Sequence, residues 1–197
     1  MSKAERTRAA LIGSAARGFR KEGYAGLGVD SIAKDAGVTS GAFYAHLGSK
    51  NGAFRVVLEA GLGEVVDTLP KYRAEHGDQW PQAFVDYYLG TAHRADVECG
   101  CAMTGLTPDV VRADAETRAD YAHRMDAIVV EIVKGLPEHG PGDDAEARAW
   151  GFISALVGGL TLARAVGPGK AADVIAETSK VSALAVLGHV TPGEPAE

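Results

Sequence analysis

The chain has 197 residues, of which 46% are hydrophobic and 23% charged, and its formal net charge is −6. This length allows a substantial buried core, and the composition is that of an ordinary globular protein rather than a disordered or disulfide-rich one. No apolar run reaches the ~18 residues that a membrane-spanning helix needs, and the charged N-terminus leads into no secretory hydrophobic region, so we expect a cytoplasmic protein.

The charge is distributed unevenly along the chain. Residues 1–50 hold eight Lys/Arg and four Asp/Glu, a balance of +4, so the remaining residues carry −10. A basic segment attached to an acidic body is typical of a DNA-contacting module joined to a second domain. A chance asymmetry of surface charge is the alternative.

Apolar residues in the N-terminal segment recur at helical spacing rather than in the alternating pattern of a strand. A first helix is predicted over 11–19, ending near Gly23, where a helix C-terminus favours a left-handed residue. Two short helices follow at about 30–36 and 40–46, joined by the turn at 37–39. These elements form a compact three-helix head.

Helical periodicity continues through the rest of the chain. Pro70 is expected to stop the helix that starts near Lys50, Pro108 to interrupt a short one, and Asp143 or Asp144 to cap a long one. We expect helices at about 50–69, from 81 onward, and at 103–112, 121–133, 144–165 and 171–187. The fold class is therefore all-α, with about nine helices.

Three segments of different character are predicted along the chain. Residues 1–50 form the compact head, and residues 51–190 form a larger helical body. Residues 191–197, rich in Pro, Gly and Glu, form a disordered tail.

The most informative segment is 32–46. Small apolar residues give its first helix a narrow face, Gly37 makes the tight turn, and Phe43 returns to the same small core. The outer side of the second helix then carries hydroxyl, phenol and imidazole groups, which suit phosphate and base-edge contacts in a major groove. An ordinary helix–helix corner with an incidentally polar face is the alternative.

The N-terminal segment resembles the DNA-binding domain of the tetracycline-repressor (TetR) family. The resemblance is carried by Thr7-Arg8, Leu11, Ile12, Ala15, Ala16, Phe19, Gly23-Tyr24, Ile32-Ala33, Ala36-Gly37-Val38, Gly41, Phe43-Tyr44, His46, Ser49-Lys50 and Phe54. It implies that the three-helix head at residues 1–50 is a helix-turn-helix DNA-binding domain and that the body at residues 51–190 binds an effector and dimerises. The homodimer would be held by the last two long helices.

The resemblance also implies a set of DNA contacts. Thr39, Ser40 and Gly41 would face base edges at the start of the recognition helix. Tyr44 and His46 would contact the sugar-phosphate backbone, and Lys50 would contact phosphate through its charge and the helix N-terminus.

Two positions depart from the family pattern. Gly28 stands where the family has Thr or Ser, so the cap of the second helix is expected to pass to Asp30, and one phosphate contact is in doubt. Leu47 replaces the usual Phe, which is a milder change in the same small core.

The body offers aromatic and soft apolar side chains, some of which are expected as a group to line an effector pocket. For each single residue, a place in the core is the alternative. The candidates are Phe84, Tyr87, Tyr88, Tyr121, Met125 and Trp150. The chemistry of the effector cannot be predicted from them.

For the dimer, small and apolar residues of the last two helices are candidates for a seam: Gly151, Ala155, Gly158, Gly159, Leu156, Leu160, Val174, Val181 and Leu184. Packing of these helices within one chain is the alternative.

The two cysteines, Cys99 and Cys101, are separated by one residue, so a disulfide between them would be strained. The Gly-Cys pair resembles the opening of a body helix in some TetR-family members, a few of which sense electrophiles or oxidants through a cysteine. Sensor thiols are therefore one prediction, and a small buried residue at a crowded turn is the other.

These observations together predict a sequence-specific transcriptional regulator, a repressor released from its operator by a small-molecule effector, with thiol-based sensing through Cys99 and Cys101 as the alternative. The expected partners are double-stranded operator DNA, an effector of unknown identity and a second copy of the chain, without a membrane. The sequence has no nucleophile elbow, phosphate-binding loop or zinc spacing. We therefore expect that the protein is not an enzyme and binds no cofactor or metal. A helical protein-interaction module is a third possibility.

Overall fold

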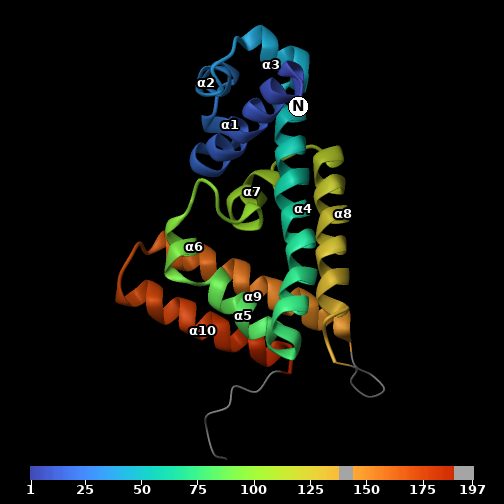
Figure 1. The fold of residues 1–197 in the computed structure, drawn as a ribbon. Helices are drawn as coiled ribbons and strands as arrows, with labels where there is room; N and C mark the ends of the chain where they lie inside the picture. Colours follow the sequence, from blue (N-terminus) through green and yellow to red (C-terminus); the bar gives the residue numbers. More distant parts are fainter. Residues whose placement is uncertain (138–143, 189–197) are drawn as a thin grey trace, which may run out of the picture. The chain divides into compact units, whose positions relative to one another are not determined.

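The computed structural model describes residues 1–137 and 144–188, which form helices joined by short connections (Figure 1). The helices are α1 (Lys3–Gly26), α2 (Val29–Asp35), α3 (Ser40–Leu47), α4 (Lys50–His76), the 3-10 helix η1 (Gly77–Gln79), α5 (Trp80–Tyr88), α6 (Thr91–Ala95), α7 (Ala102–Val110), α8 (Ala115–Val133), α9 (Ala145–Ala165) and α10 (Lys170–Val186). The predicted all-α class is confirmed, and the described part contains no strand. None of its helices is long and apolar enough to cross a membrane.

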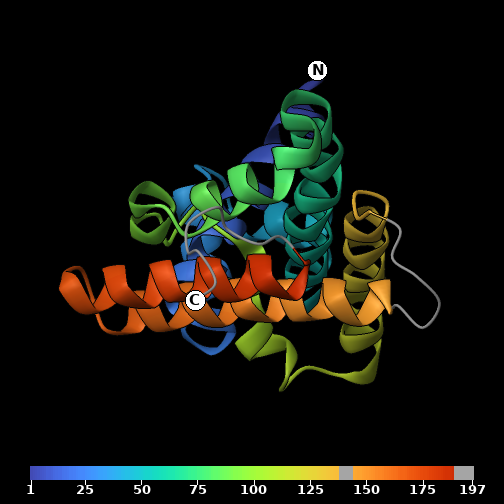
Figure 2. The same ribbon diagram turned by 90° about the horizontal axis from the view of Figure 1, so that it is seen from below.

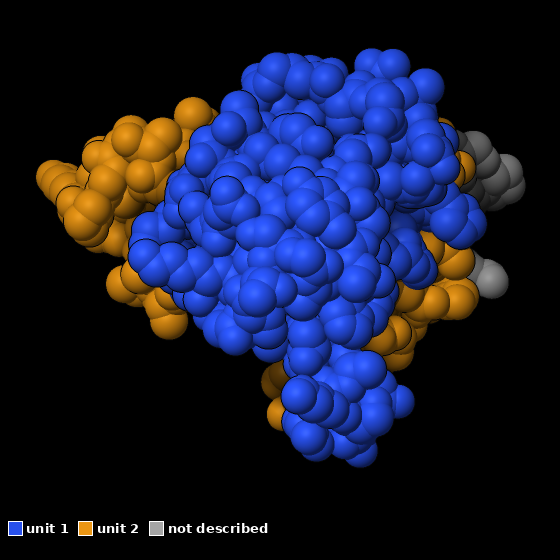
Figure 3. All heavy atoms as spheres, turned by 90° about the horizontal axis from the view of Figure 1, so that it is seen from above, with its two compact units in different colours: residues 1–64, 96–125 blue, residues 65–95, 126–197 orange. Residues whose placement is uncertain are grey.

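The chain divides into two compact units, coloured separately in Figure 3. The first unit comprises residues 1–64 and 96–125, and the second comprises residues 65–95 and 126–197. Each unit is discontinuous because α4 and α8 both begin in the first unit and end in the second. The functional boundary predicted at residue 50 stays a prediction, and the predicted tail at 191–197 lies outside the described residues.

The first unit has an aromatic core. The rings of Phe19, Tyr24 and Phe54 pack against one another with centroids 5.2 to 5.8 Å apart. Ser14 of α1 is buried, and its hydroxyl donates to the carbonyl oxygen of Ile32 in α2 at 3.0 Å. This hydrogen bond joins α1 to α2 and satisfies the buried Ser14 hydroxyl, so the two helices pack together without an unpaired polar group at this contact.

Two helices extend beyond the ends that the sequence predicted, and a third is not interrupted at its proline. α1 has a non-helical residue, Gly23 with φ 72°, at its expected end, but helical turns resume as far as Gly26. α4 passes Pro70 and reaches His76, and α7 contains Pro108. A proline costs roughly 3 kcal/mol inside a helix. The burial of neighbouring side chains, such as the fully buried Leu69, stabilises the continued helix by more than this cost.

In the second unit, α9 and α10 run side by side, as Figures 1 and 2 both show. An added methyl group at Gly151 would lie 2.7 Å from Val186, and one at Gly159 would collide with Ser179. Leu156, Leu160 and Leu184 are buried. For these five residues, packing within one chain is what the structure shows. Only Gly158, Val174 and Val181 of the predicted seam remain open to a second chain, together with part of Ala155.

A close approach in the first unit provides a stability test. A methyl group added at Gly61 of α4 would lie 2.6 Å from the Cβ of Ala102 and 2.8 Å from a guanidinium nitrogen of Arg20. Gly61→Ala should therefore lower the free energy of unfolding by about 1–3 kcal/mol, measured by denaturant unfolding. Gly63→Ala is the matched control, because no heavy atom lies within 4 Å of its added carbon. It should leave stability unchanged or raise it by ~0.5–1 kcal/mol. Equal unfolding midpoints for the two variants would contradict this packing.

Candidate nucleic-acid interface

The helix-turn-helix is formed by α2, the turn at residues 36–39, and α3. Gly37 adopts φ 69°, and the N–H of Val38 donates back to the carbonyl oxygen of Ala33 at 2.9 Å. A left-handed residue is needed for this reversal, and glycine adopts it without steric cost. Phe43 and Leu47 of α3 are buried, so the opposite side of α3 faces outward.

The structure places the predicted DNA-contact residues on this outward side or at its ends. Tyr44 is 54% exposed, and its ring packs edge-on against Phe43 with centroids 5.4 Å apart. Gly41 is exposed, and a methyl group there would meet only the Thr39 hydroxyl at 3.7 Å. No close contact with the described residues therefore requires glycine at this position. His46 is half-buried in the last turn of α3.

The two hydroxyls at the start of α3 are both engaged. Thr39 is the N-cap residue, and its oxygen accepts from the N–H of Ala42 at 3.2 Å. The Ser40 hydroxyl donates to the Asp30 carboxylate at 2.5 Å. The sequence did not reveal this second contact, because residues ten apart on different helices meet only after the turn has formed.

The predicted transfer of the α2 cap to Asp30 is wrong. Gly28 is the N-cap residue, in extended conformation and without a side-chain cap, and Asp30 lies inside the first turn of α2. A helix start needs an extended residue whose carbonyl accepts the first helical bond, and Gly28 fills that role through its bond from Ile32 N at 3.2 Å. The Asp30 side chain is thereby available for Ser40.

Lys50 opens α4, as predicted. Its ammonium lies 4.6 Å from the centroid of the Tyr24 ring, which itself packs on Phe19 and Phe54. This cation–π contact restrains a long, flexible side chain near the end of the head. Among the residues that the structure describes, Lys50 forms no ion pair with a carboxylate, so none of these residues neutralises its charge.

The start of α4 is tied to α8 by polar contacts within the first unit. Asn51 donates to the Asp114 carboxylate at 3.0 Å, and Arg55 pairs with Glu116 and Asp120, each at 2.6 Å. Asp114 accepts from the backbone N–H of Thr117 at 2.7 Å, and this bond holds the pKa of the Asp114 carboxyl below its ordinary value. These contacts hold the first turns of α4 against the first turns of α8.

The predicted effector-pocket residues are divided between the units. Phe84, Tyr87, Tyr88 and Trp150 belong to the second unit, where the rings of Phe84 and Tyr88 lie 5.8 Å apart. Tyr87 is 54% exposed and stacks on His93 at 5.1 Å. Tyr121 and the buried Met125 belong to the first unit. The Tyr121 phenol lies 2.8 Å from the Thr107 hydroxyl, and burial raises its pKa.

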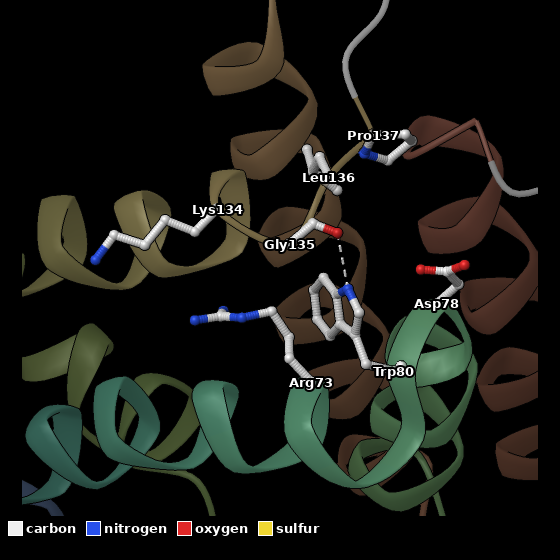
Figure 4. Close-up of a pocket in the computed structure, with 8 residues that line it drawn as sticks. Arg73, Asp78, Trp80, Lys134, Gly135, Leu136 and Pro137 are labelled. Atoms are coloured by element: carbon white, nitrogen blue, oxygen red, sulfur yellow. Dashed lines mark hydrogen bonds between the residues drawn. The ribbon is translucent and has the colours of Figure 1, made fainter.

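A pocket of about 570 Å³ lies within the second unit around Trp80 (Figure 4). The Trp80 indole N–H donates to the carbonyl oxygen of Gly135 at 3.0 Å, and Arg73 lies beside the indole and pairs with Glu131 at 2.6 Å. First the ammonium of Lys134 and then the Arg73 guanidinium lower the pKa of Glu131. None of the six predicted effector residues lines this pocket, so we assign no ligand to it.

The cysteines lie between α6 and α7. Both are free thiols, with Cys99 exposed and Cys101 buried at the N-cap of α7. Across residues 1–137 and 144–188, no group of three or more His, Cys, Asp or Glu could hold a metal ion.

Comparison with known proteins confirms the predicted resemblance. Residues 11–57 match the model of the family described as bacterial regulatory proteins, tetR family. A TetR-family regulator from Cytophaga hutchinsonii superposes with a TM-score of 0.77 at 19% identity, covering 98% of this chain and 99% of that one. No curated protein matches the sequence.

Two further solved structures have the same fold. A TetR-family regulator from Streptomyces coelicolor superposes with a TM-score of 0.72 at 22% identity, covering 93% of this chain and 95% of that one. FadR from Bacillus subtilis, solved in complex with stearoyl-CoA, has a TM-score of 0.72 at 13% identity, covering 93% and 99%. At these identities the likeness shows the fold alone.

Proposed function

We propose that this TetR-family chain is a homodimeric repressor that binds operator DNA through α3 and is released by a small-molecule effector. The observation that carries the proposal is the outward face of α3, with Tyr44 exposed and Gly41 uncrowded, in the segment that matches the family model. A short helix with small and polar residues on its outward face suits insertion into a major groove. This role is regulatory rather than enzymatic.

Exposed apolar residues on α9 and α10 support the dimer. Gly158 and Leu162 of α9 and Val166, the C-cap residue that follows it, stand at four-residue spacing, and all three are exposed. On α10, Val174 and Val181 are 57% and 55% exposed. An apolar stripe of this kind on a pair of long helices is typical of a four-helix interface across a two-fold axis. A dimer would fix the separation of two α3 helices to match two half-sites.

The contacts of α4 with α8 support a route for release. Arg55 holds the first turns of α4 to Glu116 and Asp120 of α8, and Lys50 opens the same helix. An effector that displaces α8 would therefore displace the phosphate-contacting end of α4. Coupling of roughly 1–3 kcal/mol per site would lower DNA affinity about 5- to 150-fold. FadR with stearoyl-CoA illustrates that this fold can hold a small molecule, without identifying the effector of this chain.

The experiment that tests the function is a gel shift with DNA from the regions flanking the gene of this protein, repeated over a range of salt concentrations. Lys50→Ala should weaken binding to all sequences alike and reduce the slope of log affinity against log salt by about 0.9 per lost phosphate contact. Lys71→Ala is the matched control, because it removes an exposed ammonium from the same helix outside the head. An unchanged slope for Lys50→Ala, or an equal change for Lys71→Ala, would show that Lys50 does not contact phosphate.

Thiol sensing is the second candidate, favoured by the exposure of Cys99. A charged or bulky adduct there would modify the segment that precedes α7. Lys21 of α1 pairs with Glu98 in this segment at 2.6 Å, so an adduct could disturb the head directly. Loss of operator binding after alkylation of the wild type, but not of a Cys99→Ser/Cys101→Ser variant, would favour this candidate over a non-covalent effector.

A further inference from the structure

We propose that Asp30 is a positioning residue that turns the Ser40 hydroxyl into a hydrogen-bond acceptor, so that α3 reads an exocyclic amino group, of cytosine or adenine, in the operator. This inference rests on the proposed function. It starts from the 2.5 Å bond between the Ser40 hydroxyl and the Asp30 carboxylate, which joins the first residue of α3 to the first turn of α2.

The direction of the hydrogen bond between Ser40 and Asp30 determines which groups the pair can offer to DNA. A serine hydroxyl has one proton and two lone pairs, whereas an ionised carboxylate can only accept. Because the proton of Ser40 is committed to Asp30, only lone pairs of the hydroxyl and of the carboxylate remain for a further partner. The Asp30–Ser40 pair therefore presents acceptors alone, and a bond from hydroxyl to carboxylate is among the stronger kinds of hydrogen bond.

The neighbouring hydroxyl has the opposite polarity. The oxygen of Thr39 accepts from the N–H of Ala42 at 3.2 Å, which leaves its proton available to donate. The start of α3 thus presents a donor at Thr39 and an acceptor at Ser40, although both side chains are hydroxyls. In the major groove, cytosine N4 and adenine N6 are donors, whereas guanine O6 and N7 and thymine O4 are acceptors.

Asp35 is the control residue that distinguishes the loss of the Asp30–Ser40 hydrogen bond from the loss of a negative charge. It lies on the same helix as Asp30 and is exposed, but it pairs with Arg17 of α1 at 2.6 Å rather than with α3. Removing either carboxylate takes one negative charge from the head, and each change should strengthen non-specific DNA binding. Only the loss of Asp30 frees the Ser40 proton.

The experiment selects operators from a randomised DNA library with the wild-type protein and then measures binding to single-base variants. At the position where Ser40→Ala loses discrimination, the wild type should prefer adenine or cytosine by about 3- to 10-fold, the size of one hydrogen bond. Asp30→Ala should remove this preference, whereas Asp35→Ala should keep it. A double Asp30→Ala/Ser40→Ala variant should lose no more than either single one.

Asp30→Asn covers the case in which Asp30→Ala fails to fold. Its amide oxygen can still accept from Ser40, so the preference should persist without the charge. A wild-type preference for guanine or thymine at that position, an unchanged preference in Asp30→Ala, or an equal loss in Asp35→Ala would overturn the proposal. If the wild type selects no sequence at all, the proposed function itself fails, which is a distinct result.

Discussion

Leu162→Asp combined with Val181→Asp should convert the protein into a monomer and lower its operator affinity by about 10²- to 10⁴-fold. Leu162 and Val181 are 58% and 55% exposed on α9 and α10, so each can accept a charged side chain without loss of packing within one chain. In a dimer, two pairs of carboxylates would be buried without partners. The loss of affinity follows because a monomer binds one half-site and forfeits the second, linked binding event. Sedimentation at micromolar concentration and gel shifts measure the two effects.

Val111→Asp is the control for this prediction. Val111 is 68% exposed and follows α7 in the first unit, outside the proposed dimer surface. It should leave both the sedimentation coefficient and the operator affinity as they are. If the double variant stayed dimeric, the two chains would have to meet on a surface other than α9 and α10. If it became monomeric with unchanged affinity, operator binding would not require the dimer.

Phe43→Ala should unfold the DNA-binding head. Phe43 is fully buried between α3 and the rest of the head. Removing a buried phenylalanine side chain costs about 3–5 kcal/mol, a large part of the stability of an ordinary domain. We therefore expect a lower unfolding midpoint, loss of amide protection in α2 and α3, and loss of specific operator binding at any salt concentration.

Tyr44, the residue next to Phe43, is the control for this prediction. Tyr44→Ala removes an aromatic side chain of similar size that is 54% exposed. It should leave the free energy of unfolding within about 1 kcal/mol of the wild-type value, since surface substitutions away from the core have small effects. It should also weaken DNA binding. Similar losses of stability in Phe43→Ala and Tyr44→Ala would show that the outward and inward faces of α3 are assigned wrongly.

Local sequence patterns were sufficient for most of the helices. The third helix was predicted to start at about Ser40, after the turn at 37–39, and α3 does start there with Thr39 as its N-cap. Asp144 was one of two predicted caps of α9, and its side chain accepts from Ala147 N at 2.9 Å. Such signals act within one turn of a helix, so they survive whatever the rest of the chain does. Pro70 and Pro108 misled the prediction because their local cost is outweighed by packing at a distance. The short α6 was missed because five residues show no periodicity.

The sequence by itself determined the all-α class, the place of the helix-turn-helix, and the residues on the outward face of α3. Helical periodicity and the order of the matching residues from Thr7 to Phe54 carry that information. Only the tertiary structure decided that Ser40 donates to Asp30, that Gly151 and Gly159 pack within one chain, and that Leu162 remains exposed. The physical reason is that each of these facts depends on which helices approach each other closely. Side chains far apart in sequence acquire partners only through that approach.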